Sequence, residues 1–324
     1  MANTHLSKPA INSAASGVEI ETPQHGFFDM AFEYLYPPYS NITDPIPNYQ
    51  FDDLIDPSLI PSKNVYLKKE KLDYCVQYFK NYLTDFVQHG QTPFINQHVY
   101  NDDLPPSLQD AYCGCASYLA KTAANERLIF GIISSKLAEL VSKRQYCSIE
   151  DELASVQALI MYQIIRLFDG DIRQRGIAEA QFQILDSWAM SLRQRGEFEI
   201  PLSNQSSPYR DWLFIESVRR TVLMSIFLKG IYYAIKNGFC DQVPAMQGLP
   251  LTVKGELWEA KSESDWMLAT HGSQPDVITY HDFVLIWDGG DVEGFQKMLL
   301  VACIGEEGLQ TRFLESLTKG VGWS

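Results

Sequence analysis

Residues 208–221 read PYRDWLFIESVRRT and open the longest helical pattern of the chain. Ser207 can cap this helix and Pro208 suits its first turn, whereas Gly238 is a natural terminator. Apolar side chains recur between them at three- and four-residue steps, which predicts a long amphipathic helix with one apolar face. The residues of that face are Trp212, Ile215, Val218, Val222, Ile226 and Tyr233.

Charged residues in this helix are spaced for pairing. Glu216 stands three and four residues before Arg219 and Arg220, so it can pair with either along the helix surface. Each such pair stabilises a helix by about 0.2–0.5 kcal/mol. We interpret these charges as structural, serving helix packing and contacts between helices, with catalysis as the alternative. Downstream, Trp258 and Trp266 are predicted to anchor a core or a helix junction, with a ligand cage as the alternative.

Residues 67–324 are predicted to form one helical domain. Strand signals are weak, because no alternating run is followed by a hairpin turn and a partner run. The fold class is therefore all-α, an irregular multi-helix domain that is either a bundle or a curved helical array. Apart from the helix at 208, the predicted helices lie near residues 66–90, 106–121, 123–143, 148–167, 172–195, 279–287, 291–303 and 307–318. Gly90 is expected to end the first of them, and Ser148 to cap the start of the fourth.

Residues 1–66 differ from the rest of the chain. They hold many of the prolines and eight acidic residues against Lys8 and Lys63, without helical periodicity, which predicts an extended or disordered arm. Within the arm, one stretch interleaves acidic and apolar side chains, a pattern that can dock into a partner's groove. The alternative is a solvated arm that packs two of these side chains, Phe51 and Leu54, on the helical domain. The stretch comprises Phe51, Asp52, Asp53, Leu54, Ile55 and Asp56.

Composition narrows the classes of partner. The 324-residue chain has 26 basic against 40 acidic side chains, a net charge of −14 that opposes contact with phosphate backbones. We find no signal peptide, and the longest apolar run, Met298–Ile304, is too short to span a membrane. A soluble intracellular protein is expected, and its six scattered cysteines are predicted to be buried free thiols.

Motifs for catalysis, metals and cofactors are missing. Phosphate loops, nucleophile elbows and dinucleotide fingerprints do not occur, and acidic doublets are explained as charges at helix starts. We therefore predict no catalytic residue, no metal and no cofactor. The cysteine and histidine pairs whose spacing does not suit a metal site are Cys113 with Cys115, His89 with His98, and His271 with His281.

Three motifs resemble the regulatory middle region of fungal zinc-cluster (Zn2Cys6) transcription factors. They are the Trp212-x-x-x-Glu216-x-x-Arg219-Arg220-Thr helix, a Leu-Pro pair at 249–250, and Leu-Trp-Glu-Ala at 257–260. The likeness spans roughly residues 105–266 and implies a helical regulatory domain, nuclear residence and control of secondary metabolism or nutrient use. A zinc cluster needs two Cys-x-x-Cys halves, which this chain lacks, so direct sequence-specific DNA binding is not expected.

The resemblance favours a transcriptional regulator that acts through transcription factors or co-regulators, or through a small-molecule effector. One alternative is a helical enzyme or small-molecule binding protein derived from the same fold, and another is a chain whose zinc cluster lies upstream of Met1. We expect no membrane association. No sustained heptad appears, so a homodimer would use the helical domain itself. Without the resemblance, a cytoplasmic location is the simpler expectation.

Overall fold

The computed structural model describes residues 65–100, 103–143, 148–196, 207–271, 277–287, 292 and 294–320. All of them belong to one compact unit, Gln50–Ser324. Except for its last two residues, the predicted arm lies outside the described residues. The elements are α2 Lys69–His89, η2 Gln97–Val99, α3 Pro106–Leu119, α4 Glu126–Ser142, α5 Ile149–Phe168, α6 Ile172–Ala180, α7 Phe182–Gly196, α8 Pro208–Asn237, α9 Val243–Gln247, β1 Pro250–Thr252, η3 Gly255–Glu259, α10 Glu263–Thr270, β2 Val277–Thr279, α11 Tyr280–Ile286 and α12 Gly294–Gly320.

Helix ends follow the local signals in the sequence. The Ser148 hydroxyl accepts a hydrogen bond from the Asp151 amide at 3.1 Å, and the Ser207 hydroxyl accepts one from the Arg210 amide at 3.4 Å. Gly90 ends α2 with a φ of 70°, a left-handed conformation that favours glycine. These predicted boundaries are confirmed.

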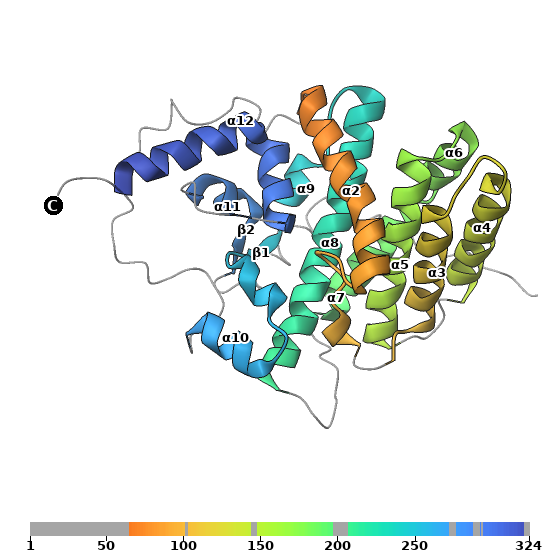
Figure 1. Ribbon diagram of the computed structural model, residues 1–324, viewed down its shortest axis with the longest axis horizontal. Helices are drawn as coiled ribbons and strands as arrows, with labels where there is room; N and C mark the ends of the chain where they lie inside the picture. The colour runs from red at the N-terminus through yellow and green to blue at the C-terminus, as the bar shows by residue number, and fades with distance from the viewer. Residues whose placement is uncertain are drawn as a thin grey trace, which may run out of the picture. The chain divides into compact units, whose positions relative to one another are not determined.

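Helix α8 is the centre of the domain. In Figure 1 it lies between α3–α6 on one side and α9–α12 with the two strands on the other. It contacts α2, α5 and α7 as well as α9, α10 and β1. The all-α class and the irregular multi-helix architecture are confirmed. None of the described helices is long and apolar enough to cross a membrane.

The prediction of an amphipathic α8 is wrong, because the helix is enclosed on nearly all sides. Polar Ser217, Thr221 and Ser225 are buried, whereas Ile226 and Tyr233 of the predicted apolar face are only half-buried. The Ser217 hydroxyl donates to the Leu213 carbonyl at 2.7 Å, and the Ser225 hydroxyl donates to the Val222 carbonyl at 2.7 Å. Hydroxyls that bond back to their own helix can be buried at little cost.

One predicted helix is divided in two. Residues 172–195 form α6 and α7 with a break at Gln181, whose side-chain oxygen accepts a hydrogen bond from Arg166 Nη1 at 2.7 Å. Arg166 is 1% exposed, and this burial lowers its pKa; its Nε donates to the Gln174 side chain at 3.1 Å. The break therefore places the Gln181 amide oxygen beside the buried Arg166 guanidinium. Helix α6 itself provides only one acceptor for that group, the Gln174 side chain.

The structure differs from the prediction at two other places. The strands β1 and β2, which were not predicted, pair antiparallel with Leu251 opposite Ile278. Three residues each are too few for an alternating pattern to show. The predicted helices 291–303 and 307–318 run as α12, interrupted at Gly305, where φ is 79° and ψ is 168°.

Candidate functional site

The charged triplet of α8 lies inside the protein. Glu216 is fully buried, and Arg220, one turn further along α8, is 3% exposed. Arg219, at the third position, has a side chain that is 24% exposed. The sequence predicted these charges to pair along the helix surface. The structure corrects the location, because β1, η3 and the segment after α2 cover this part of α8.

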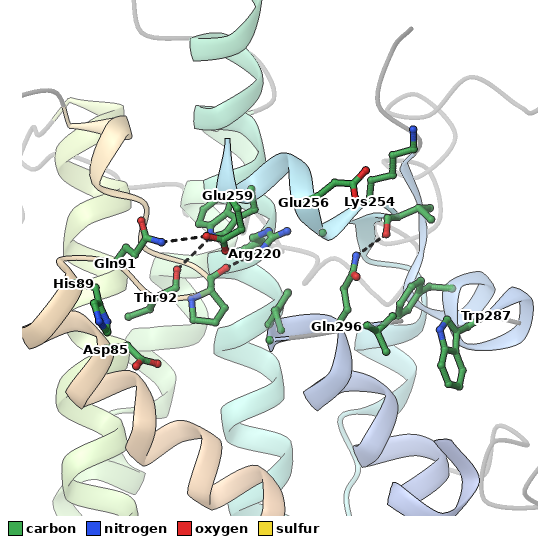
Figure 2. Close-up of a pocket in the computed structure, with 18 of the residues that line it drawn as sticks. Asp85, His89, Gln91, Thr92, Arg220, Lys254, Glu256, Glu259, Trp287 and Gln296 are labelled. Carbon is green, nitrogen blue, oxygen red and sulfur yellow. Dashed lines mark hydrogen bonds between the residues drawn. The ribbon is translucent and has the colours of Figure 1, made fainter. Parts of the chain in front are cut away.

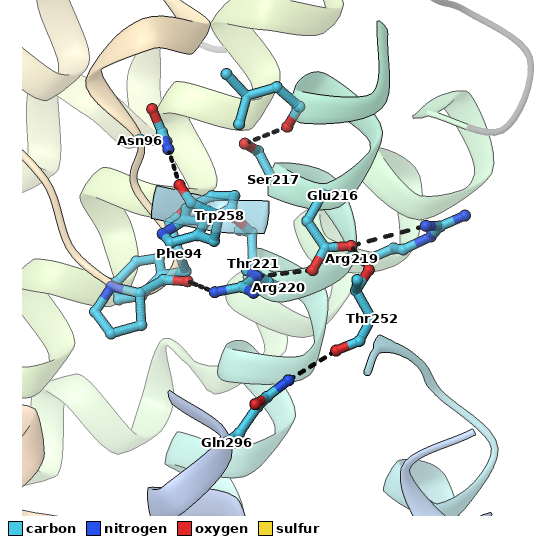
Figure 3. Close-up of polar contacts among 12 residues, drawn as sticks. Phe94, Asn96, Glu216, Ser217, Arg219, Arg220, Thr221, Thr252, Trp258 and Gln296 are labelled. Atoms are coloured by element: carbon cyan, nitrogen blue, oxygen red, sulfur yellow. Dashed lines mark hydrogen bonds and ion pairs between the residues drawn. The ribbon is translucent and has the colours of Figure 1, made fainter. Parts of the chain in front are cut away.

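Glu216 uses both carboxylate oxygens (Figure 3). Its Oε1 accepts a hydrogen bond from Arg220 Nε at 2.8 Å, and its Oε2 accepts one from the Thr252 hydroxyl at 2.6 Å. Arg219 forms an ion pair with the same Oε2 at 3.7 Å. One buried carboxylate therefore faces two guanidinium groups, which leaves the triplet with a charge of +1.

The Arg220 guanidinium is held by an aromatic ring and a carbonyl. Its central carbon lies 4.2 Å from the centroid of the Trp258 ring and 5.5 Å from that of Phe295. Nη1 donates to the Pro93 carbonyl at 3.1 Å. Nη2 is buried and has no hydrogen-bond partner among the described residues. A buried N–H group without a partner costs about 1–3 kcal/mol, more when it is charged.

Further hydrogen bonds fix the groups around Arg220. The Trp258 indole donates to the Thr92 carbonyl at 3.3 Å, while the Asn96 amide donates to the Trp258 carbonyl at 3.0 Å. The Gln296 amide donates to the Thr252 carbonyl at 2.9 Å and to the Val253 carbonyl at 2.7 Å. These bonds tie the segment after α2 and the start of α12 to the β1–η3 segment.

A cleft of about 910 Å³ opens beside Arg220. Figure 2 shows Gln91 and Thr92 toward one side of the view and Gln296 and Trp287 toward the other, with Arg220 between them. The lining also includes apolar side chains of the β1–η3 segment, of α11 and of the chain around the start of α12, and several charged residues. They are Val253, Phe283, Ile286, Val292, Phe295, Asp85, His89, Lys254, Glu256 and Glu259.

Two of the three carboxylates that line the cleft are exposed. Glu256 and Glu259 are exposed, and Glu259 accepts a hydrogen bond from the Gln91 amide at 3.4 Å. Asp85 is half-buried, and this burial raises the pKa of its carboxyl, while the nearby His89 opposes the rise. Solvent and salt screen the rim carboxylates far more than the buried Arg220 guanidinium.

The predicted tryptophan anchors come together in a second, smaller core. Trp212 of α8 packs on Trp266 of α10 with ring centroids 5.8 Å apart, and Trp258 of η3 joins them. The residues of this small core are Tyr209, Trp212, Leu213, Leu257, Trp258, Ala260 and Trp266. All six motif residues predicted to be structural thus lie in or near the first half of α8, but Arg220 and Trp258 also line the cleft.

Other predicted features lie elsewhere. The stretch Phe51–Asp56 lies outside the described residues. Within the described ranges, no group of three or more His, Cys, Asp or Glu side chains is placed to hold a metal ion. The prediction of buried cysteines is wrong for Cys113, which lies on the exposed side of α3. The described cysteines are all free thiols: Cys75, Cys113, Cys115, Cys240 and Cys303.

Sequence reasoning missed the partners that α8 draws from distant segments. Thr252 follows Glu216 by 36 residues, and the Pro93 carbonyl precedes Arg220 by 127. Neither residue belongs to a chemical motif. The side chain of Thr252, in a Pro-containing stretch, gave no signal that it would meet a buried carboxylate.

Comparison with known proteins identifies one kind of relative. The chain is 40% identical over 196 residues to the transcription factor gsfR2 of Penicillium aethiopicum, an alignment that covers 57% of this chain and 47% of that protein. The chain thus spans about half the length of this relative. No protein-family model and no solved structure matches it. The zinc-cluster class stays a prediction. Over the matched residues, the chain is similar to a fungal transcription factor, in keeping with the resemblance of its motifs.

Proposed function

We propose that this chain regulates transcription in the nucleus and reaches its target promoters through protein partners. The observation that carries the proposal is the 40% identity to a fungal transcription factor over 196 residues. Identity at this level over that length supports a shared role. Since the alignment covers 47% of the relative, activities of the remaining part of that protein are not transferred.

The charge of the chain supports recruitment by proteins instead of direct contact with DNA. A net charge of −14 repels a phosphate backbone, whereas DNA-binding surfaces are locally basic. Other transcription factors or co-regulators are the partners that fit this charge. We further propose that the regulated genes serve secondary metabolism or nutrient use, in keeping with the family resemblance.

Chromatin immunoprecipitation of the tagged full chain in its native cell tests the proposal. We expect reproducible peaks at promoters, absent from an untagged strain, and altered transcript levels of the neighbouring genes after deletion of the gene. Good expression without promoter peaks or transcript changes would refute transcriptional regulation by this chain.

The stretch Phe51–Asp56 is the proposed docking segment. Replacing Phe51 and Leu54 by Ser should abolish the promoter peaks, because the apolar side chains that enter a partner's groove are lost. The matched control places Ser at Phe28 and Leu35, which are also in residues 1–66. Unchanged peaks together with a lower melting temperature would show that the stretch packs on the helical domain instead.

A further inference from the structure

The buried charges of α8 are not balanced within the described part of the chain. Glu216 is the one carboxylate there that forms an ion pair with Arg220, and it also forms one with Arg219. Arg220 is 3% exposed, and its Nη2 has no partner among the described side chains and carbonyls. Buried cations in proteins are normally paired or fully hydrogen-bonded. Counting the partly exposed Arg219, the triplet is therefore one negative charge short.

The missing charge would be supplied at the cleft. Arg220 is part of the cleft lining, and the cleft's volume of about 910 Å³ is in the range of small-molecule sites. Phe283, Phe295 and Val292 give it apolar walls. An apolar body with one anionic group matches these two features, a cationic floor and apolar sides.

We propose that the cleft binds a small organic carboxylate, whose carboxylate group pairs with Arg220 and whose apolar body lies against Phe283 and Trp287. A monoanion neutralises the charge of +1 on the triplet. A phosphate dianion would exceed it and would face the carboxylates of Asp85 and Glu259 at the rim. Nη2 is covered from water in the unliganded cleft, so a lining side chain changes rotamer on binding, a common adjustment. The site does not depend on the proposed role in transcription.

Calorimetric titration of the purified full chain with 1-naphthoate and 1-naphthamide tests the charge requirement. The two probes share an aromatic body and differ in charge. We expect 1-naphthoate to bind about tenfold more tightly or better, since a charge-assisted hydrogen bond contributes about 1.5–3 kcal/mol. Equal affinities, or no saturable binding of 1-naphthoate at millimolar concentration, would overturn the proposal.

Two substitutions test whether the carboxylate group of the ligand binds at Arg220. Arg220→Gln should abolish the preference for 1-naphthoate. Glu216→Gln keeps an oxygen acceptor for Arg220 but removes the competing charge, so 1-naphthoate should bind more tightly while 1-naphthamide is unaffected. A purely structural Glu216 would not strengthen binding of an anion. Unchanged affinity in Glu216→Gln would overturn the site even if Arg220→Gln fails to fold.

A third variant and a control locate the apolar body. Trp287→Ala should weaken both probes, because each loses the same ring contact. The control is Ile132→Ala on α4, whose side chain is 42% exposed and does not line the cleft. It should leave both affinities unchanged. If Trp287→Ala leaves both affinities unchanged as well, the apolar body does not lie in this cleft.

Discussion

At the scale of single residues, Glu216 holds the buried charges of α8 together. Glu216→Ala should lower the free energy of unfolding by about 3–5 kcal/mol, because it leaves the Arg220 guanidinium buried without its carboxylate. Glu216→Gln should cost less, since an amide oxygen still accepts from Arg220 Nε and the amide group can donate to the Thr252 hydroxyl. Urea-induced unfolding followed by far-UV circular dichroism measures both.

The control is an ion pair near the surface. Glu126 pairs with Lys121 at 3.1 Å, and its side chain is 50% exposed. Glu126→Ala should change the free energy of unfolding by about 1 kcal/mol or less. Similar losses in Glu126→Ala and Glu216→Ala would contradict the assignment of Glu216 as the charge on which this end of α8 depends.

The pairing of Glu216 with Arg220 was predictable, but the burial of the pair was not. Four-residue spacing on a helix brings two side chains together whatever surrounds them. Burial depends on Trp258, Thr252 and Gln296, which arrive from segments remote in the sequence. Trp258 lies in a recognised motif and was predicted to be an anchor, but no local pattern marks any of the three residues as part of a polar site.

At the scale of elements, helix ends were predictable because a cap acts within four residues. Helices begin at Ser148 and Ser207 and end at Gly90 and Gly238, where the sequence indicated. The break between α6 and α7 was not, since Gln181 is an ordinary helix former. At that break Gln181 accepts a hydrogen bond from Arg166 of α5. This is a tertiary contact, which the pattern of a single helix does not show.

Gly305 divides α12, and an alanine there should be costly. Its φ of 79° with ψ of 168° is a conformation that residues with a Cβ rarely adopt. An added Cβ would also lie 3.2 Å from Cε of Lys71, whose ammonium group donates to the Cys303 carbonyl. Gly305→Ala should therefore reduce the free energy of unfolding by about 1–3 kcal/mol, measured by urea titration.

A glycine-to-alanine substitution on α4 should have the opposite effect on the free energy of unfolding. Gly131 lies within α4 on an exposed side, and a Cβ there would meet no atom within 4 Å. Gly131→Ala should stabilise the protein by about 0.5–1 kcal/mol, because glycine loses more conformational freedom on folding. A stabilising Gly305→Ala would show that α12 runs straight through this position.

At the scale of the whole molecule, the cleft is a product of tertiary structure. Its lining comes from α2, the segment after it, α8, the β1–η3 segment, α11 and the start of α12. The sequence predicted the helical class and the anchoring role of Trp258, but it placed no cavity. Arg220, Trp258 and Glu259 lie in recognised motifs, but the other lining residues do not, so they could not be selected from the sequence.

Helix α8 also connects the two cores. Its first turns supply Tyr209, Trp212 and Leu213 to the small core, and later residues such as Phe227 and Leu228 belong to the large core, together with Phe79 of α2. Arg220 stacks on Trp258 of the small core and lies 5.5 Å from the ring of Phe295, in the large one. Loss of either core therefore removes support from the other.

This connection predicts one cooperative unfolding transition. The variant with Phe at Trp188 and Trp287 keeps three tryptophans in the small core, Trp212, Trp258 and Trp266, together with Trp323 outside the described residues. Its fluorescence therefore reports mainly on that core, whereas far-UV circular dichroism reports on all helices. In urea, the two signals should show the same midpoint, as two-state unfolding requires. A fluorescence midpoint at lower urea would mean that the small core opens first and that α8 does not couple the cores.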